Sequence, residues 1–415
     1  MTIVVGAGLA GLTCAKVLAE AGRPFCLLEA SARPGGRVVS DRTSEGFILD
    51  RGFQVLLDSY PAARRHLDFP AVGGGRFRAG AMFVGQGGTP RTLENPLRRP
   101  WAAWGALLSG VLSFPDQLRL MRLAVMAMTR SSRADDLSTD EFLSRCGFGE
   151  EFFVRFARPF FGGVLLDPAL QTSAGLFLNY LQRFVTGRAL LPARGMGGLA
   201  EQLVARLPRE SVHFETRVDA LVFREERVCG VRLADGRSLE ADEVVLAVDE
   251  PSTCRLLGQG NPRPARGTAV HYFASDRALY SGGWLCLPPR SQASPVLHAA
   301  MVTNVAPALA PAGMHLWSVT VLPEHPQAAD AEFVAGEVTS WFQAGAGLLR
   351  PLSYVQVPYA VPEQLPGFER RPAPWGALPP GLLVVGDAAC GASIDAVMAS
   401  GEAAAKKVIL SSGLN

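Results

Sequence analysis

Lysine is nearly absent from this chain of 415 residues. The chain has 40 basic residues, yet only Lys16, Lys406 and Lys407 are lysines, and all other basic residues are arginines. A site that depends on a lysine amine is therefore excluded from residues 17–405. This exclusion restricts the reactions that can be considered for the middle of the chain.

Several other features are missing. The seven cysteines are scattered and form no CxxC pair, and the six histidines are dispersed, so neither a disulfide framework nor a metal site is expected. The formal net charge of +2 is too small to indicate a nucleic-acid partner. No run reaches the ~18 apolar residues of a membrane span. No signal peptide is recognisable before the first strand, which favours a cytoplasmic location.

The composition is that of a globular protein, with 48% hydrophobic and 19% charged residues. The length predicts two domains or one large discontinuous domain. The first 28 residues predict a strand at Ile3–Val5, a helix at Leu9–Ala21 and a second strand at Phe25–Leu28. This order is a βαβ unit.

A glycine motif joins the first strand to the first helix. Gly6 permits a tight turn, Gly8 lets the backbone approach a pyrophosphate at the helix N-terminus, and Gly11 lets helix and strand pack closely. Glu29 ends the second strand, where its carboxylate can bind the ribose hydroxyls of adenosine. A carboxylate there opposes a 2′-phosphate by charge repulsion. The pattern predicts a site for a dinucleotide without that phosphate.

Gly35, Gly36 and Arg37 follow shortly afterwards. The two glycines allow close approach of a ligand, and Arg37 can neutralise phosphate. From "GAGLAGL" to "LLEASARPGGR" the chain resembles the N-terminus of flavin-containing amine oxidases, protoporphyrinogen oxidases and phytoene-desaturase-type enzymes. Residues 158–173 and 303–313 resemble most a poorly characterised branch near the phytoene desaturases. The dinucleotide of that superfamily is FAD.

Four further segments support the resemblance. Residues 47–55 resemble the segment under the isoalloxazine ring, 191–207 the segment that re-enters the FAD domain, 216–223 the strand that reads adenine, and 384–401 the terminal Gly-Asp motif. The resemblance implies the α/β class, with a Rossmann-like FAD-binding domain of the glutathione-reductase-2 type and a discontinuous α+β substrate domain.

The implied partition is discontinuous. Residues 1–70, 190–255 and 370–415 would form the FAD-binding domain, and residues 71–189 and 256–369 the substrate-binding domain. FAD bound without a covalent link is expected, although a link through Cys390 or a histidine stays open. The residues that the resemblance places at FAD are Gly6, Gly8, Leu9, Ala10, Gly11, Glu29, Ala30, Gly36, Arg37, Gly52, Phe53, Gln54, Val218, Gly386, Asp387, Ile394, Asp395 and Ala396.

The terminal motif predicts a strand, a polar turn and an Ala-rich helix over 395–410. Asp387 could accept a hydrogen bond from a ribityl hydroxyl, and the helix N-terminus would favour the anionic reduced flavin. Relatives usually have Asn-Gly where this chain has Asp395 and Ala396. We expect Asp395 to cap this helix, with Ser393 as the competing cap.

The expected chemistry is dehydrogenation. The resemblance implies that an amine oxidase of this superfamily commonly has a lysine near flavin N5 and an aromatic residue in the terminal motif. This chain lacks both, which argues against a primary-amine oxidase. A desaturase-like enzyme needs only a dry pocket and hydride transfer to flavin N5. We expect a mainly apolar substrate such as a polyene or prenyl lipid. Phe160 and Phe161 are candidate pocket aromatics, between walls predicted in 101–185 and 268–360.

Three polar side chains are candidates for catalysis. Gln54 is the best polar candidate near the flavin, and His271 and Tyr272 are candidates for an acid–base group. A flavin amine oxidase, a non-redox FAD-dependent polyene isomerase and a flavin-binding partner protein stay as alternatives. Without a second dinucleotide motif, electrons would leave to oxygen or a quinone. Residues 101–128 are expected to form a buried helical hairpin or, alternatively, to touch a membrane surface.

Overall fold

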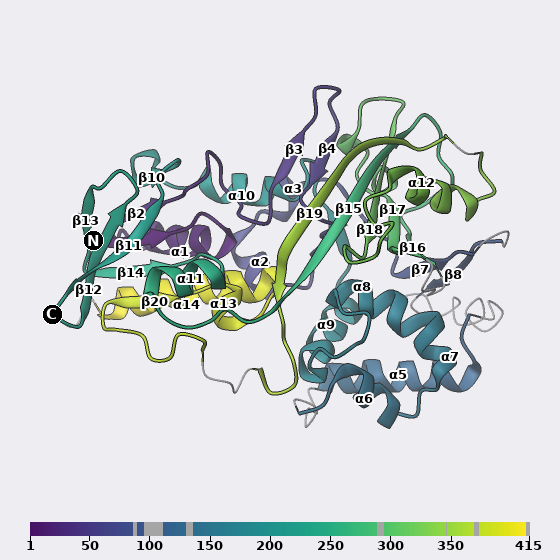
Figure 1. The fold of residues 1–415 in the computed structure, drawn as a ribbon, viewed down its shortest axis with the longest axis horizontal. Helices are drawn as coiled ribbons and strands as arrows, with labels where there is room; N and C mark the ends of the chain where they lie inside the picture. Colours follow the sequence, from purple (N-terminus) through teal and green to yellow (C-terminus); the bar gives the residue numbers. More distant parts are fainter. Residues whose placement is uncertain are drawn as a thin grey trace.

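The computed structural model is elongated and consists of two halves, one at each end (Figure 1). The parallel sheet and the helix pair α1 and α14 form one end, and a large antiparallel sheet with a group of helices forms the other. The structure describes residues 1–85, 89–94, 111–129, 136–288, 294–345, 347–368 and 373–411.

The parallel sheet unites segments from the start, the middle and the end of the chain. Its order is β10-β2-β1-β14-β20, and every neighbouring pair is parallel. This arrangement confirms the predicted α/β class and the Rossmann-like domain. The residue boundaries of the two domains stay a prediction. The strands are β1 (Thr2–Val5), β2 (Phe25–Leu28), β10 (Val212–His213), β14 (Glu243–Leu246) and β20 (Leu382–Val384).

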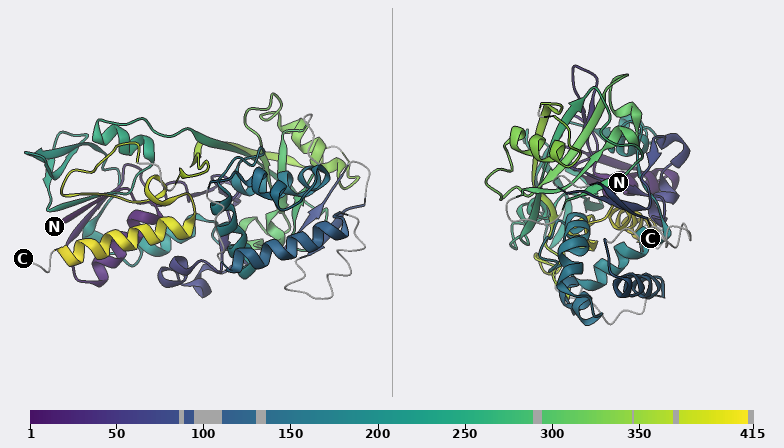
Figure 2. Two further views of the ribbon diagram at one scale, coloured as in Figure 1. Left: turned by 90° about the horizontal axis from the view of Figure 1, so that it is seen from below. Right: turned by 90° about the vertical axis from the view of Figure 1, so that its right-hand side faces the viewer.

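Two long helices pack against each other on this sheet. They are α1 (Leu9–Glu20) and α14 (Ile394–Ser411), which Figure 2 shows side by side in purple and yellow. A Cβ atom at Gly401 would lie 2.1 Å from the backbone oxygen of Ala10, so only glycine permits this approach. The first and last helices of the chain are thereby held in direct contact.

A small antiparallel sheet extends the end of the molecule that contains the parallel sheet. We call this end the cofactor half, after the predicted FAD-binding domain, and the other end the substrate half. It consists of β11 (Val218–Arg224), β12 (Arg227–Leu233) and β13 (Ser238–Glu240). Further helices in this half are α2 (Pro61–His66), α3 (Phe69–Val72), α10 (Gly197–Val204), α11 (Glu250–Leu257) and α13 (Asp387–Cys390), with a 3₁₀ turn at Arg209–Ser211.

The seven-stranded sheet forms the centre of the substrate half. Its order is β19-β15-β18-β17-β16-β7-β8, and α12 (Ala331–Ser340) covers one face. Long β15 and β19 extend towards the cofactor half (Figure 1). The strands are β7 (Gly80–Phe83), β8 (Arg91–Glu94), β15 (Ala265–Ser275), β16 (Leu285–Leu287), β17 (Val296–Met301), β18 (His315–Val321) and β19 (Arg350–Pro362).

Short strands connect the two halves. The pair β3 and β4 forms a hairpin, and β5, β9 and β6 form a three-stranded sheet. Their bounds are β3 (Ser40–Arg42), β4 (Ile48–Asp50), β5 (Leu56–Leu57), β6 (Gly75–Arg76) and β9 (Ala189–Leu191). Two 3₁₀ turns, Val302–Asn304 and Pro307–Leu309, follow β17.

The helices predicted within 101–185 are present in the described part, and residues 101–110 lie outside the described residues. The Ser138 hydroxyl accepts a hydrogen bond from the Glu141 amide at 3.1 Å, which starts α6. The segment Phe153–Phe161 is a π-helix with Pro159 inside it. The α-helices are α5 (Phe114–Thr129), α6 (Thr139–Arg145), α7 (Glu150–Phe152), α8 (Gly162–Leu165) and α9 (Ala174–Thr186).

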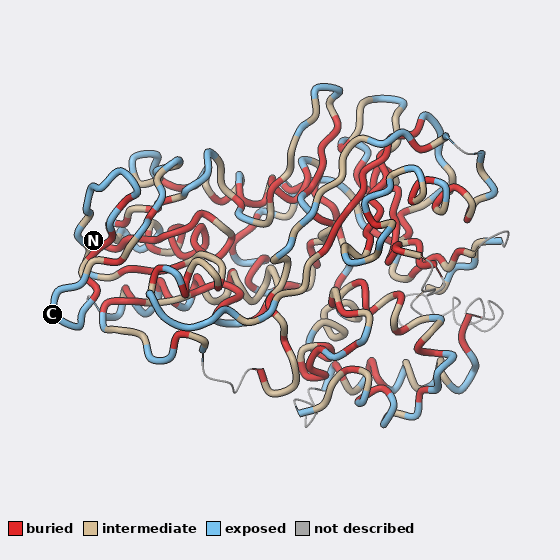
Figure 3. The backbone as a smooth tube through the Cα atoms, viewed as in Figure 1, coloured by how far each residue is buried: buried red, intermediate tan, exposed pale blue. Residues whose placement is uncertain are grey.

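Buried residues concentrate in the strands of both large sheets (Figure 3). Within the described ranges, no helix combines the length and apolar character that crossing a bilayer requires.

Candidate flavin and substrate site

The glycine loop leaves open space in front of α1. Gly6 has a φ of +102°, and a Cβ at Gly11 would lie 2.0 Å from the Gly6 oxygen, so both positions require glycine for the fold itself. A Cβ at Gly8 would meet no atom within 4 Å. The Gly35 amide donates to the Ala7 oxygen at 2.8 Å, which holds the second glycine pair beside this loop. The space at Gly8 therefore fits a pyrophosphate at the helix N-terminus.

Glu29 connects the glycine loop to the part of the predicted site that would hold adenosine. Its Oε2 accepts a hydrogen bond from the Ala7 amide at 2.7 Å, and its Oε1 accepts from Ser31. A carboxylate oxygen can accept more than one hydrogen bond, so a ribose hydroxyl can still bind. The Thr216 amide donates to the backbone carbonyl oxygen of Glu29 at 2.8 Å. The chain leading to Val218 is thereby placed next to Glu29, as the predicted adenine contact requires.

The terminal Gly-Asp turn carries a buried carboxylate. Asp387 is 3% exposed, and its Oδ2 lies 2.7 Å from Nη1 of Arg37. Nη1 of Arg37 donates its hydrogen bond to the backbone oxygen of Ala360 at 2.8 Å. Oδ2 of Asp387 therefore forms an ion pair with Arg37 but accepts no hydrogen bond of good geometry. Burial opposes the charged form of Arg37, but the negative charge of Asp387 beside it outweighs this effect and raises the pKa of Arg37. Asp387 therefore keeps the capacity to accept a cofactor hydroxyl.

The prediction that Asp395 caps its own helix is wrong. The Ser393 hydroxyl accepts a hydrogen bond from the Ala396 amide at 3.0 Å and caps α14. Oδ1 of Asp395 instead accepts from the Ala62 amide at 2.7 Å, within the first turn of α2, because α14 packs against that helix. Its other oxygen lies 4.0 Å from Arg183. The Asp395 carboxylate thus stabilises a helix junction.

Two tyrosines approach the terminal turn from distant parts of the chain. The Tyr180 hydroxyl donates to the Ala392 oxygen at 2.8 Å. Burial raises the pKa of Tyr180, and burial together with the charge of Asp395 raises the pKa of Tyr60. The motif itself contains no aromatic residue, yet the fold supplies two. No sequence signal links positions 60, 180 and 392, because only the tertiary fold brings them together.

Gly52, Phe53 and Gln54 lie between the two halves. Gly52 has a φ of +96°, which favours glycine. Nε2 of Gln54 donates to the Arg37 oxygen at 3.3 Å, whereas its buried Oε1 has no hydrogen-bond partner. The Tyr272 hydroxyl donates to the backbone carbonyl oxygen of Asp50 at 2.8 Å. Tyr272 is therefore bound to the segment that is predicted to run under the flavin, and Gln54 belongs to that segment.

His271 lies on the other face of the same sheet. Its Nε2 is 2.6 Å from the Ala328 oxygen, and its ring packs against Tyr354 with centroids 4.5 Å apart. Burial lowers the pKa of His271. Because adjacent residues of a strand point to opposite faces, His271 and Tyr272 cannot serve one site. The structure does not place His271 at the cavity, which contradicts its predicted acid–base role.

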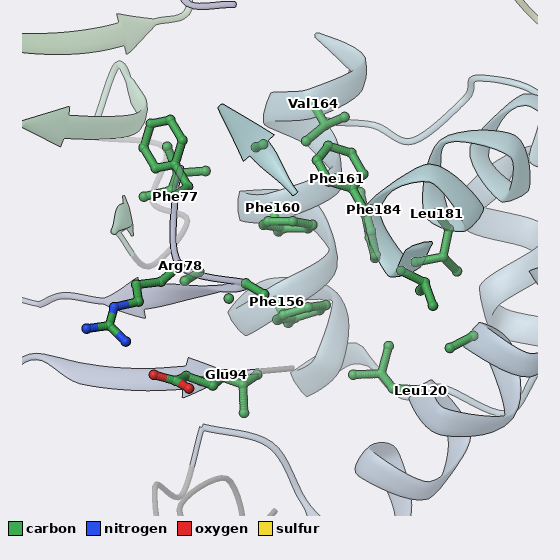
Figure 4. Close-up of a pocket in the computed structure, with 18 of the residues that line it drawn as sticks. Phe77, Arg78, Glu94, Leu120, Phe156, Phe160, Phe161, Val164, Leu181 and Phe184 are labelled. Carbon is green, nitrogen blue, oxygen red and sulfur yellow. The ribbon is translucent and has the colours of Figure 1, made fainter. Parts of the chain in front are cut away.

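A cavity of about 290 Å³ lies between the large sheet and the helices of the substrate half (Figure 4). Phe53 lines it on the side of the predicted flavin segment, and Arg78, Glu94 and Arg188 are its charged lining residues. Its apolar wall includes Phe77, Phe156, Phe160, Phe161, Leu181 and Phe184.

The π-helix supplies three of these aromatic rings. Phe160 stacks on Phe156 with centroids 5.6 Å apart and meets Phe161 edge-on at 5.1 Å. π-helical turns occur often at functional sites. Phe160 and Phe161 line the cavity, as predicted from the sequence. Phe156 and Phe184 were not predicted, because apolar residues in a helical region do not reveal which side they face.

The fold joins a Rossmann-like sheet to an antiparallel sheet, and the glycine loop, the acidic strand end and the Gly-Asp turn converge. These features together define a dinucleotide-dependent oxidoreductase. The sequence pattern of the family described as flavin containing amine oxidoreductase matches residues 9–409, and the chain belongs to this family. FAD is its cofactor, which fits the open space at Gly8 and the buried carboxylate of Asp387 beside Arg37.

Relatives in this family differ in their reactions. The chain is 28% identical over 357 residues to coproporphyrinogen III oxidase from Propionibacterium freudenreichii, covering 68% of this chain and 66% of that protein. It is 26% identical over 305 residues to putrescine oxidase from Kocuria rosea, covering 66% and 63%. An oxidoreductase structure from Methanosarcina mazei superposes with a TM-score of 0.74 at 20% identity, covering 98% and 99%.

Proposed function

We propose that this flavoprotein dehydrogenates a mainly apolar substrate, such as a polyene or prenyl lipid. The observation that carries the proposal is the cavity of about 290 Å³ with its phenylalanine wall. Ligand sites are usually apolar concavities with a few polar groups that set orientation. The cavity and the predicted flavin segment share Phe53, so a substrate in the cavity would lie next to that segment.

The cofactor half would hold FAD through the backbone at Gly8, the carboxylates of Glu29 and Asp387, and the guanidinium of Arg37. Bound FAD supplies a two-electron acceptor that takes a hydride from carbon. The protein contributes orientation and a dry surrounding, which the aromatic wall provides. A substrate that loses a hydride and a proton gains one double bond.

Charged residues at the cavity favour an amphipathic substrate. Arg78 and Glu94 lie together away from the phenylalanine cluster (Figure 4). The guanidinium of Arg78 lies 6.0 Å from the centre of the Trp284 ring. An apolar body in the aromatic part and an anionic or polar end at Arg78 and Arg188 would match this distribution of charge.

A porphyrinogen is the second candidate substrate. The relative from Propionibacterium freudenreichii is named for coproporphyrinogen, and it aligns with 68% of this chain. Arginines beside an apolar cavity also suit a large ring with acidic groups. Amine oxidation is disfavoured by the lack of lysine within 17–405, although Tyr60 and Tyr180 supply aromatic neighbours to the terminal turn.

Product mass tests the proposal. FAD-loaded protein is incubated with a polyene, a prenyl lipid, a porphyrinogen and putrescine, with oxygen or a quinone as the electron acceptor. We expect an apolar substrate to lose two hydrogens. A polyene product of unchanged mass would identify an isomerase, and turnover of putrescine alone would identify an amine oxidase. Either result contradicts the proposal.

A face of α5 supports contact with a lipid surface. Five of its side chains are 42–58% exposed, and they recur at alternating spacings of four and three residues along one side of the helix. Met121 belongs to this face and also lines the cavity. We propose that a membrane surface covers it and delivers the substrate. The five residues are Phe114, Leu118, Met121, Val125 and Met128.

Vesicle co-sedimentation tests the lipid contact. The double variant Leu118→Glu/Val125→Glu places two charges on the exposed face and should lose binding to vesicles that contain anionic lipid. Phe223→Glu changes an equally exposed apolar residue on β11 in the cofactor half and serves as the control. Equal vesicle binding by both proteins, or a dimer that the double variant disrupts, would contradict the lipid contact.

A further inference from the structure

Strand β19 carries a buried tyrosine hydroxyl beside the terminal Gly-Asp turn. Among the described residues, the hydroxyl of Tyr359 has no hydrogen-bond partner. Oδ2 of Asp387, in the turn itself, likewise accepts no hydrogen bond of good geometry. Buried polar atoms without a hydrogen bond are uncommon in proteins unless water or a ligand satisfies them. Two such atoms at one turn therefore indicate a place where a ligand binds.

A bulge in β19 determines the direction of this part of the strand. The register between β15 and β19 shifts here, so that residues 358–360 stand opposite Gly267 alone. A Cβ at Gly267 would lie 3.3 Å from the Pro358 oxygen, so the glycine lets the bulged strand come close. Bulges often lie next to functional sites, where they redirect a side chain. Tyr359 is the middle residue of this bulge.

Hydrogen bonds of the neighbouring residue place the bulge at the predicted cofactor site. Nη1 of Arg37 donates to the backbone oxygen of Ala360, the residue that follows Tyr359, at 2.8 Å. The same nitrogen lies 2.7 Å from Oδ2 of Asp387. In addition, β19 packs against α13, which begins at Asp387. Arg37 thus connects the bulge to the terminal Gly-Asp turn.

The charged groups around the hydroxyl are paired with one another. Glu250 is fully buried and accepts a hydrogen bond from Nε of Arg263 at 2.8 Å. Burial and the negative charges of Glu250 and Asp387 raise the pKa of Tyr359, and the two nearby arginines oppose this effect. The hydroxyl therefore stays protonated at neutral pH and can donate a hydrogen bond. The charge of Asp387 acts on this hydroxyl, although the two side chains do not bond to each other.

A ligand hydroxyl between these two side chains would satisfy both of them. A hydroxyl donates one hydrogen bond and accepts others, so it can donate to the Asp387 carboxylate and accept from Tyr359 at the same time. An ionised phosphate oxygen only accepts and could not serve the carboxylate. The ribityl chain of FAD carries such hydroxyls, and Asp387 is the predicted acceptor for one of them.

We propose that Tyr359 binds FAD by donating a hydrogen bond to the ribityl hydroxyl that donates to Asp387. This inference rests on the proposed binding of FAD at Asp387, and it is independent of which substrate is oxidised. The bulge supplies the direction of the tyrosine, and the bond of Arg37 to Ala360 holds the bulge at the turn.

The affinity of the apoprotein for FAD, measured by flavin fluorescence, tests the proposal. Tyr359→Phe should raise the dissociation constant about 10-fold, as expected for one lost hydrogen bond, and Tyr354→Phe should change it less than about twofold. Tyr354 is the matched control, because it lies on the same strand and its hydroxyl already accepts from Gln356 at 3.0 Å. If only Asp387→Asn weakens FAD binding, the role of Tyr359 is wrong. If neither Asp387→Asn nor Tyr359→Phe does, the proposed FAD contact of Asp387 fails as well.

FAD analogues that each lack one ribityl hydroxyl locate the contact. With the analogue that lacks the bound hydroxyl, the wild type and Tyr359→Phe should have equal affinity. With the other analogues the difference of about 10-fold should remain, because the hydrogen bond is still present in the wild type. The same difference with every analogue would overturn the ribityl contact.

Thermal unfolding separates this role from a structural one. Tyr359→Phe should leave the melting temperature of the apoprotein unchanged or raise it, yet reduce the increase that FAD produces. Lower apoprotein stability with unchanged FAD affinity would assign the hydroxyl to the fold and contradict the proposal. If Tyr359→Phe does not fold, fluorotyrosine at position 359 alone keeps the hydroxyl. Its fluorine NMR signal should shift when FAD binds, and an unchanged signal would contradict the contact.

Discussion

The two halves of this molecule build their sites in different ways. In the cofactor half the predicted site is formed mainly by the backbone. Glycines stand where a side chain would collide, and carboxylates hold the loops together through hydrogen bonds to backbone amides. The substrate half uses side chains that face one another from a sheet and a π-helix. The carboxylates of Glu29 and Asp395 accept hydrogen bonds from backbone amides of neighbouring segments, whereas the wall of the cavity consists mainly of apolar side chains.

This difference teaches where specificity resides. A backbone site accepts a ligand common to a whole family, because its requirements are a turn, an open space and a helix end. A side-chain site depends on which residues happen to meet across the fold. The cofactor half therefore determines that FAD is the cofactor, and the substrate half must determine which substrate reacts. Substitutions in the two halves should separate these contributions.

The largest effect is expected in the glycine loop, where two glycines have different tasks. Gly11→Ala places a Cβ 2.0 Å from the Gly6 oxygen and should prevent both folding and flavin binding. Gly8→Ala meets no atom within 4 Å at a φ of −72°, which alanine adopts freely. This variant should fold with unchanged or slightly higher apoprotein stability, yet lose FAD affinity. Thermal unfolding and visible absorbance check both proteins. Equal behaviour of the two variants would contradict the separation of roles.

A large loss of stability without loss of the cofactor is expected in the substrate half. Phe161 is 4% exposed and contacts Phe156, Phe160 and Phe177. Phe161→Ala should lower the free energy of unfolding by about 3–5 kcal/mol, while the folded fraction keeps one flavin per chain. Phe160→Ala, at a half-buried position, should cost less. Flavin lost in proportion to stability would show that the halves do not act independently.

Helix caps at the terminal turn give a smaller effect. Asp395→Ala and Ser393→Ala each remove a cap and should cost about 1 kcal/mol. Because the Asp395 carboxylate is bound at α2, its removal should leave the flavin reduction potential unchanged. Denaturant unfolding measures the first effect and a redox titration the second. A large shift in potential for Asp395→Ala would mean that its charge acts on the flavin.

A pH dependence of stability is expected in the cofactor half. Burial opposes ionisation of Glu402, but hydrogen bonds from Lys406, Arg65 and His66 outweigh it and lower the pKa of Glu402 to about 2. A depressed pKa stabilises the fold above the ordinary pKa near 4.5, and this contribution is lost as the pH falls towards 2. Glu402→Gln should therefore lower the melting temperature at pH 7 more than at pH 3. The exposed Glu45→Gln should change it little at either pH.

Sequence reasoning predicted the fold and the cofactor correctly where geometry permits few residue types, and the individual cofactor contacts stay predictions. The glycine loop, Glu29, Arg37 and the Gly-Asp turn could be recognised because their spacing along the chain reflects a backbone requirement. Asp395 was predicted to cap its own helix, α14, but its carboxylate accepts a hydrogen bond from α2. The sequence does not show that a neighbouring helix offers a donor to this side chain.

The substrate half was less predictable for a related reason. His271 was predicted as an acid–base residue, and only the folded sheet shows that its side chain is bound at Ala328, away from the cavity. Phe160 and Phe161 could be predicted as pocket residues, whereas Tyr60 and Tyr180 reach the terminal turn from positions that share no local pattern. Long-range packing, rather than local spacing, decides these contacts.

Anaerobic mixing of FAD-loaded protein with candidate substrates tests the central claim most directly, because only a true substrate bleaches the oxidised flavin. We predict rapid loss of visible absorbance with an apolar polyene, prenyl lipid or porphyrinogen, and no loss with putrescine or an amino acid. Fast bleaching by putrescine, with the apolar compounds inert, would contradict an account in which the phenylalanine-lined cavity selects the substrate.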